Sequence, residues 1–351
     1  MGLLRYTIHR FLQAIPVMFG IAVITFLLMN AMPGDPVDIM LAEQEATPEL
    51  IAAIEARYGL DEPLHIQFLN YIGFSWFLAQ LGVPGFAGSP PGLLQGDLGL
   101  SMYYERPVTN LILVRLPPTL LLMISAFAFA LATAIPLGVL AAKRRNEPTD
   151  HVSRVIALIG VSTPSFWIGI MLIILFSVQL GWLPSGRLVY PWRDPVHYGY
   201  SGHLELYYQS IRHLILPMVA LGTLQMATIM RVERSSMIES LGAEYVKLAR
   251  AYGVPERTIM RKHAFRVAQL PVVTLVGLNL TSAIGGAVLI EMVFSINGMG
   301  RLLIQAIQTY DYQLVLGTTV VIGFVFVIGV IITDISYAYI DPRVRFGEEG
   351  S

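Results

Sequence analysis

The chain has 351 residues, of which 55% are apolar and only 13% are charged, and its formal net charge is −1. Soluble domains carry about a quarter charged residues, so this composition indicates an integral membrane protein, and the near-zero charge gives no reason to expect a nucleic-acid partner. The sequence contains no cysteine, which excludes disulfides, thiol catalysis and cysteine metal sites in this chain.

Six uncharged apolar runs are long enough, or nearly so, to cross a bilayer as helices, which takes about 20 residues. They cover residues 11–34, 116–142, 155–186, 213–230, 267–290 and 312–333. A seventh apolar stretch, within 63–96, is interrupted by polar residues and then by crowded glycine and proline, so we expect a helix lying in an interface or a small external domain. The first run follows Arg5 and Arg10 but is too long for a signal peptide, so we expect an uncleaved span.

The lysines and arginines indicate the orientation. With six spans and a cytoplasmic N-terminus, most of them fall in inner loops, including the triplet at 143–145 and the basic stretch 241–271. A seventh span would move both segments outside. We therefore expect a multi-pass protein of the inner or plasma membrane with both termini in the cytoplasm.

The region between the first two runs, residues 35–115, is acidic. The sequence TPEL at 47–50 predicts a helix start, and Gly59 predicts its stop. We expect a small α-rich lobe outside the membrane, whose acidic residues suit either a solvated surface or a surface facing a partner. The aromatic segment 187–213 between the third and fourth runs is either an external docking or gate surface or the packed core of that segment.

The stretch 241–271 is the longest water-compatible segment between two apolar runs in the second half, and it is basic. Residues 243–251 are good helix formers, Gly253 suits a left-handed helix stop, and Pro255 suits the first turn of a new helix. We therefore expect two short helices with a break between them. From these residues alone, the stretch is either a docking surface for a cytoplasmic partner or an ordinary basic loop at the lipid surface.

Polar and small residues gather in the fifth run and at its end, where burial in lipid is costly. They are Asn279, Thr281, Ser282, Gly285, Gly286 and Glu291. These residues either line a polar route for a solute or serve tight packing between helices, which uses the same residue types.

The sequence lacks the motifs that would make the chain catalytic by itself. It has no phosphate-binding loop of the GxxxxGK[ST] type, no HExxH metal pair, no GxSxG nucleophile turn and no lysine within an apolar run. We expect neither an enzyme nor a bound cofactor or metal. No series of acidic residues at mid-membrane suggests a proton relay, which weakens the case for an ion-coupled carrier.

Six short segments, taken in order, resemble one known family. They are residues 4–35, ending in Pro-Gly-Asp; GDLGLS at 96–101 with RPV at 106–108; RLP at 115–117; the loop 244–271 with ARAYG at 249–253; NGMG at 297–300 with DY at 311–312; and DPR at 341–343. Together they resemble the membrane subunits of ABC-type importers, specifically the oligopeptide/dipeptide permease family of binding-protein-dependent transport systems. The resemblance runs nearly end to end.

This resemblance implies an all-α integral membrane protein with six transmembrane helices in the type I ABC importer fold, and a small α-rich extracytoplasmic lobe between the first and second spans. The expected divisions are 1–34 for the N-terminal segment and first helix, 35–115 for the lobe, 116–340 for a core of five helices with the coupling loop 231–267, and 341–351 for a cytoplasmic tail.

The resemblance also implies that the loop is a coupling helix that docks in a groove of a cytoplasmic ATPase. The residues assigned to this site are Glu244, Tyr245, Lys247, Leu248, Ala249, Arg250, Ala251, Tyr252, Gly253 and Val254. The generic importer loop has a glutamate six residues before its glycine, where this chain has Lys247. The assignment therefore concerns the loop as a whole rather than Glu244.

The implied partners are a second permease subunit, two cytoplasmic ATPases that bind ATP and Mg²⁺, an extracytoplasmic solute-binding protein and membrane lipid. The family carries di- and oligopeptides but also nickel, glutathione, opines and some oligosaccharides, so the solute stays open. A self-sufficient ion-coupled carrier and an intramembrane enzyme are the rival classes. Uptake without any ATPase would favour the first, and turnover by the purified chain alone would establish the second.

Overall fold

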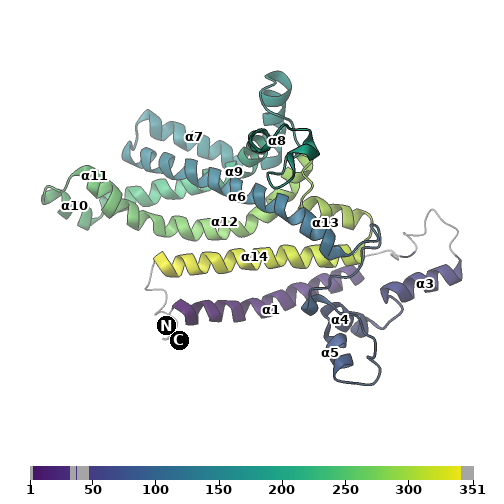
Figure 1. The fold of residues 1–351 in the computed structure, drawn as a ribbon. Coiled ribbons are helices and arrows are strands. Elements are labelled where there is room, and N and C mark those ends of the chain that lie inside the picture. The colour runs from purple at the N-terminus through teal and green to yellow at the C-terminus, as the bar shows by residue number, and fades with distance from the viewer. Residues whose placement is uncertain (1–2, 32–36, 38–46, 341–351) are drawn as a thin grey trace. The chain divides into compact units, whose positions relative to one another are not determined.

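The computed structural model describes residues 3–31, 37 and 47–340, although the side chains of 3–4, 278, 280–286 and 337–340 lie outside the description. Within these ranges the regular elements are helices, and the extended pairing is limited to an isolated antiparallel bridge between Leu100 and Pro107 (Figure 1). The expected all-α architecture is therefore confirmed. The DPR segment and the tail 341–351 fall outside the described residues.

The chain forms two compact units, each assembled from separate stretches of sequence. Unit 1 comprises Met1–Phe11, Pro118–Asn297 and Ile328–Ser351, and unit 2 comprises Leu12–Pro117 and Gly298–Val327. Three long helices contribute residues to both units: α1 (Leu3–Asn30), α6 (Val108–Lys143) and α14 (Tyr312–Ile340). The division expected from sequence, at residues 34, 115 and 340, remains a prediction.

Unit 2 contains the first of the expected short helices. Helix α3 (Pro48–Tyr58) begins after Thr47, whose Oγ1 accepts a hydrogen bond from the Leu50 N–H at 3.3 Å, and it ends at Gly59 in the left-handed region at φ 66°. Both boundaries agree with the sequence, because Thr47 satisfies a free N–H of the first turn and glycine tolerates positive φ.

The ambiguous stretch 63–96 is not one long helix. It forms α4 (Leu64–Ile72) and α5 (Phe74–Gln80), which meet at Gly73 with φ 86°, and then a short 3₁₀ turn, η1 (Leu93–Gln95). A helix of this length rises about 1.5 Å per residue and falls well short of the ~30 Å hydrocarbon layer. This stretch, all of whose residues are described, therefore contains no helix of spanning length, and its place in an interface or an external domain remains a prediction.

A buried carboxylate joins two motifs that are far apart in sequence within unit 2. Asp311, which precedes α14, is fully buried and accepts hydrogen bonds from the Ser101 hydroxyl and from the Tyr103 N–H, the latter at 3.1 Å. Its other oxygen accepts from the Leu314 N–H at 3.1 Å, which caps the start of α14. The GDLGLS and DY segments are therefore two sides of one packing site, next to α13 (Met299–Gln308).

Unit 1 is built around α9 (His203–Gly242), which packs on α12 (Phe265–Val293), α7 (Pro148–Ser162) and α8 (Ser165–Leu172). Its remaining elements are a π-helical turn η2 (Ile173–Gln179), a 3₁₀ turn η3 (Pro195–Tyr198), α10 (Glu244–Ala251), α11 (Glu256–Thr258) and a π-helical segment η4 (Ile259–Ala264). Small residues allow close approach: a Cβ on Gly222 of α9 would lie 2.7 Å from the Ala126 carbonyl oxygen of α6.

Four helices within the described residues are long and apolar enough to cross a membrane: Arg5–Asn30, Val108–Lys143, His203–Gly242 and Tyr312–Ser336. The third expected run is bent rather than straight, since α7 and the following helix meet at 106° and count as a fifth span only if taken as one. Thr163 at the bend has extended backbone angles, which the residue before a proline favours, and Pro164 lacks an N–H to continue the helix.

Candidate functional site

The basic stretch folds into two short helices joined by a tight turn, as its sequence predicts. Helix α10 ends at Ala251, Gly253 adopts φ +74°, and its N–H donates to the Arg250 carbonyl at 2.9 Å. The Val254 N–H donates to the Ala249 carbonyl at 3.1 Å, and this pattern of a left-handed glycine with two backward bonds is a common helix termination. We call residues 243–259, from the cap of α10 to the start of η4, the hairpin.

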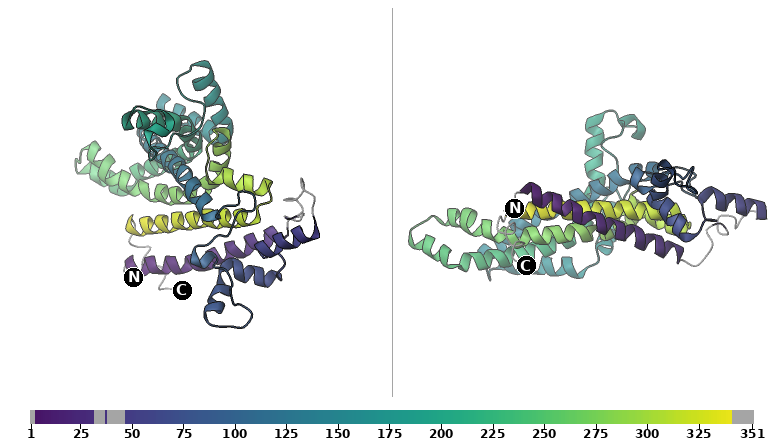
Figure 2. Two further views of the ribbon diagram at one scale, coloured as in Figure 1. Left: turned by 45° about the vertical axis from the view of Figure 1, so that its right-hand side comes forward. Right: turned by 90° about the horizontal axis from the view of Figure 1, so that it is seen from below.

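The hairpin lies at one end of the α9–α12 pair, which it connects (Figures 1 and 2). Helix α10 presents two different faces. Val246 is fully buried, and α10 packs on α9 and η4. On the other side Tyr245, Leu248 and Tyr252 are 42%, 58% and 80% exposed, and their spacing of three and four residues places them on one helix face.

All ten residues assigned to ATPase coupling lie together in this hairpin. Only Ala249 and Val254 among them are half-buried, and the others are exposed. Val246, which is not among the ten, is the fully buried residue of α10, on the side where α10 packs on α9 and η4. An exposed apolar face on a helix that is anchored from behind suits contact with another protein.

Two ion pairs shape the hairpin surface. The Arg250 guanidinium contacts both oxygens of Glu256, with Nη2–Oε1 at 2.8 Å and Nε–Oε2 at 3.2 Å, and so bridges α10 and α11 across the Gly253 turn. Lys247 pairs with Glu244 at 2.7 Å. The hydrogen bond from Arg250 lowers the pKa of Glu256. Solvent screens such exposed pairs, and each contributes about 1 kcal/mol or less to stability.

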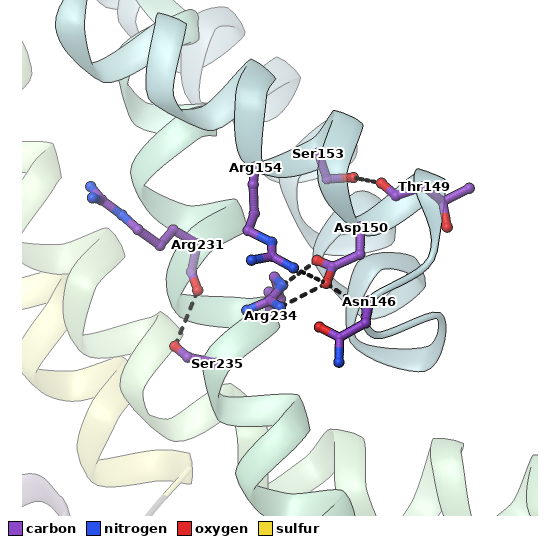
Figure 3. A network of polar contacts seen from close by, with 8 residues as sticks. All are labelled: Asn146, Thr149, Asp150, Ser153, Arg154, Arg231, Arg234 and Ser235. Atoms are coloured by element: carbon purple, nitrogen blue, oxygen red, sulfur yellow. Dashed lines mark hydrogen bonds and ion pairs between the residues drawn. The ribbon is translucent and has the colours of Figure 1, made fainter.

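A buried polar network joins α7 to α9 (Figure 3). Asp150, in the first turn of α7, is fully buried and receives both Nε and Nη2 of Arg234 in α9, at 2.5 and 2.8 Å. Arg154 Nη2 adds a bond at 2.8 Å, and the Asn146 N–H adds another at 2.9 Å. We call these four residues the clamp. The sequence indicates that Asp150 is an acidic residue at a helix start, but it does not predict the pairing with Arg234, 84 residues away.

The residue before Arg234 makes a second link. Glu233 is fully buried, and its Oε2 accepts a hydrogen bond from Gln269 Nε2 of α12 at 2.8 Å. A Cβ on Gly138 of α6 would lie 2.7 Å from the Glu233 Cβ, so α6 and α9 approach closely at this point. The C-terminal part of α9 is therefore linked to α7, α12 and α6 through consecutive residues.

Two of the six predicted pathway residues have described contacts. Asn279 Nδ2 donates to Thr228 Oγ1 of α9 at 3.3 Å, and Glu291 is fully buried and accepts from Thr119 Oγ1 of α6 at 2.5 Å. For Thr281, Ser282, Gly285 and Gly286, burial and contacts lie outside the description. No cluster of three or more potential metal ligands occurs in the described part of the chain.

The aromatic segment after η2 is partly packed and partly exposed. Leu188 and Val189 are buried, and the Arg187 N–H donates to the Phe294 carbonyl at 2.8 Å. Trp192 stacks on Tyr190 with ring centroids 5.3 Å apart and is half exposed. The segment therefore has a packed base and an exposed aromatic tip, and a role of the tip as a docking or gate surface remains a prediction.

Comparison with known proteins gives consistent matches along the chain. Residues 134–346 match the family described as binding-protein-dependent transport system inner membrane component, and residues 3–123 match the N-terminal part described for the same kind of membrane component. The chain is 36% identical over 342 residues to the oligopeptide transport system permease protein of Bacillus subtilis, with 97% of this chain and 99% of that protein covered.

Two dipeptide permeases are similarly close. The dipeptide transport system permease protein of Escherichia coli is 37% identical over 357 residues, covering 98% of this chain and 99% of that protein. The corresponding protein of Alkalihalophilus pseudofirmus is 36% identical over 353 residues, covering 98% and 100%. The similarity therefore spans both units and includes the hairpin, the clamp and the Asp311 site.

Proposed function

Because the chain belongs to the family of inner membrane components of binding-protein-dependent transport systems, we propose that it is the permease subunit of an ATP-driven importer of the ABC type. The observation that carries the proposal is the hairpin. Its apolar face of Tyr245, Leu248 and Tyr252 is exposed, while Val246 anchors it from behind. This geometry supports a role for α10 as the element that docks on a cytoplasmic ATPase.

In this proposal the chain does not bind nucleotide. Two partner ATPases bind ATP and Mg²⁺, and their closure moves α10 together with the ends of α9 and α12. A second permease subunit, identical or different, completes the pathway, and a solute-binding protein delivers the solute from outside. The proposal needs no catalytic residue in this chain, and alternating access follows from rigid-body motion of packed helices.

We propose six transmembrane spans. The four helices that meet the length and hydropathy criteria and the bent α7–α8 pair supply five, and α12, with 29 residues, supplies the sixth. The hairpin then lies in the cytoplasm with both termini, and α3 to α5 lie outside as the extracytoplasmic lobe. The polar residues of α12, from Asn279 to Glu291, are proposed to line the solute route at the interface with the second permease subunit.

The proposed solute is a di- or oligopeptide, because the similar permeases named above are described as components of peptide transport systems. A non-peptide solute such as an oligosaccharide, glutathione, an opine or nickel is the alternative within the same mechanism. The further alternative is an ion-coupled carrier, which would transport solute without any ATPase.

The test is reconstitution of the chain with its co-purifying partners in liposomes, with ATP hydrolysis and peptide uptake measured together. Leu248→Glu places a charge in the exposed apolar face, so we expect loss of bound ATPase and of uptake. Leu204→Glu is a matched control, because Leu204 lies near the other end of α9 and is 87% exposed. The proposal fails if the chain purifies alone and still transports solute, or if both variants behave alike.

A further inference from the structure

The C-terminal part of α9 continues almost directly into the hairpin. Helix α9 ends at Gly242 and α10 begins at Glu244, so Ala243 alone separates them. Ala243 has extended backbone angles, φ −69° and ψ 151°, and its N–H donates to the Ser240 carbonyl at 3.3 Å. A movement of α10 is therefore passed first to the last turns of α9, where Glu233 and Arg234 lie.

Among the contacts described for this end of α9, the clamp is the link whose geometry is fixed by charge. Arg234 holds Asp150 through two parallel N–H groups, an arrangement that specifies direction as well as distance. The Asp150 carboxylate is fully buried, and Arg234 retains 20% side-chain exposure. Since the carboxylate is buried, sliding Arg234 along α7 would remove two of its four hydrogen bonds and leave the charge with Arg154 and the Asn146 N–H alone.

The clamp also fixes the start of α7 rather than its middle. Asn146, whose N–H donates to the same carboxylate, lies at φ +65° in the turn between α6 and α7. Asp150 lies in the first turn of α7 and therefore connects this turn both to α9 and to the α6–α7 turn, as Figure 3 shows. The opposite end of α7 is the 106° bend at Thr163 and Pro164.

The neighbouring links are of a different kind. Glu233 reaches α12 through a single amide hydrogen bond from Gln269, and α6 approaches it through Gly138 without any polar contact between those two residues. Packed helices joined by apolar and single-bond contacts can shift past one another by small shear movements. A bidentate buried ion pair resists that shear, so α7 has to follow α9.

We propose that the Asp150–Arg234 ion pair transmits movement of the hairpin from α9 to α7, with Arg154 and Asn146 completing its geometry. We call this transmitting contact the joint. This inference rests on the proposed function of the hairpin. Asp150 and Arg234 are positioning residues: they touch neither solute nor nucleotide, and they act by keeping α7 fixed to α9 while α9 moves. The bend between α7 and α8 is then the place where that movement reaches the rest of the α7–α8 pair.

The test uses Asp150→Asn combined with Arg234→Gln, which removes both charges of the pair, while Arg154, whose side chain is 47% exposed, keeps its access to water. The measured quantity is solute taken up per ATP hydrolysed by the reconstituted complex. We expect this ratio to fall by about 5-fold or more, the lower range of coupling between sites, while the ATPases stay bound. Arg231→Gln is the matched control, since Arg231 is on the same helix and points away from Asp150 in Figure 3.

A second measurement, the distance between spin labels on α7 and α9, distinguishes a contact that transmits movement from one that only stabilises the fold. Because the chain has no cysteine, single cysteines can be placed at Val152 of α7 and Ser235 of α9, both exposed, and spin-labelled. With the clamp intact, we expect the label-to-label distance to be the same with and without ATP. In the double variant the distance should differ between the two states or its distribution should broaden.

The outcomes distinguish this inference from the proposed function. If the unaltered chain binds no ATPase, the proposed function fails and the joint fails with it. If the unaltered chain couples uptake to ATP and the double variant shows the same ratio and the same distances, the inference about the ion pair is wrong and the proposed function stands. Arg234→Lys on the intact Asp150 keeps the charge but loses the two-pronged geometry, so its ratio should lie between those of the unaltered chain and the double variant.

Discussion

Among the described residues of unit 1, two arginine–carboxylate pairs are bidentate, and they lie in opposite surroundings. Arg250 and Glu256 meet at the exposed hairpin with side chains 44% and 56% exposed, whereas Asp150 is fully buried beneath Arg234 and Arg154. Water screens the first pair and competes for its hydrogen bonds, and it is excluded from the carboxylate of the second. The same ion pair should therefore contribute little to stability at the exposed hairpin and much more at the buried Asp150 carboxylate.

The largest effect should come from breaking the buried pair on one side only. Asp150→Asn leaves Arg234 and Arg154 facing a neutral amide and weakens four hydrogen bonds to a buried charge. Because a hydrogen bond to a charged group contributes about 1.5–3 kcal/mol, we expect the free energy of unfolding to fall by about 3 kcal/mol or more. The measurement is equilibrium unfolding of the purified chain in mixed detergent micelles.

Two further variants complete that measurement. Asp150→Asn with Arg234→Gln should recover part of the loss, because the second change removes the less exposed of the two guanidinium charges that would otherwise face the amide. Glu256→Gln, the matched change at the exposed pair, should cost less than about 1 kcal/mol. Equal losses for Asp150→Asn and Glu256→Gln would contradict the comparison, since burial would then make no difference.

A buried carboxylate without an arginine sharpens the comparison. Asp311 in unit 2 is also fully buried, but its bonds come from the Ser101 hydroxyl and from the N–H groups of Tyr103 and Leu314. Asp311→Asn turns one acceptor into a donor that faces another donor, so we expect a loss of about 1–3 kcal/mol in the same unfolding measurement. A loss as large as that of Asp150→Asn would show that the charge of the guanidinium partners is not what distinguishes the clamp.

Local chemistry predicted the short elements well because the deciding residues are neighbours in sequence. Thr47 and Gly59 delimit α3, and Gly253 ends the α10 turn, as the capping preferences of threonine and glycine require. The sequence contains Pro164 in the third apolar run, but it did not predict the bend at this proline. Whether a proline kinks, breaks or merely starts a helix depends on what packs around it, and sequence alone does not supply that.

The candidate site divides in the same way. The exposed hairpin follows from composition and from the family resemblance, and its ten residues lie together. The clamp and the Glu233–Gln269 link were not found, because the partner of a buried charge comes from a distant segment of the chain. Nothing in the residues around Asp150 distinguishes an ordinary acidic helix start from the centre of a buried network. The three-dimensional arrangement of α7 and α9 supplies that information.

A smaller effect tests the shape of the hairpin without changing its charge. Gly253 lies at φ +74° with open space where a Cβ would stand, so Gly253→Ala should cost about 1 kcal/mol through backbone strain alone. Gly242→Ala, at the last residue of α9 and also in open space, should be neutral or slightly stabilising, because alanine favours a helix over glycine by about 1 kcal/mol. The check is the unfolding free energy of each variant, and a loss at Gly242 as large as at Gly253 would contradict a left-handed requirement at the turn.

The smallest effect concerns the exposed pair as pH falls. The hydrogen bond from Arg250 lowers the pKa of Glu256 below its ordinary value of 4.5. A carboxyl whose folded-state pKa is depressed adds stability above its unfolded pKa and loses it as pH falls through the folded one. The Arg250–Glu256 bridge should therefore be fully formed at neutral pH and should open only below pH 4.5.

Titration of ¹³C-labelled glutamate carboxyls by NMR measures the pKa of Glu256 directly, with Glu256→Gln identifying the resonance. Arg250→Gln should move the midpoint back toward the ordinary value, and a midpoint for Glu256 that does not respond to Arg250 would show that water, rather than the arginine, sets the charge of this surface.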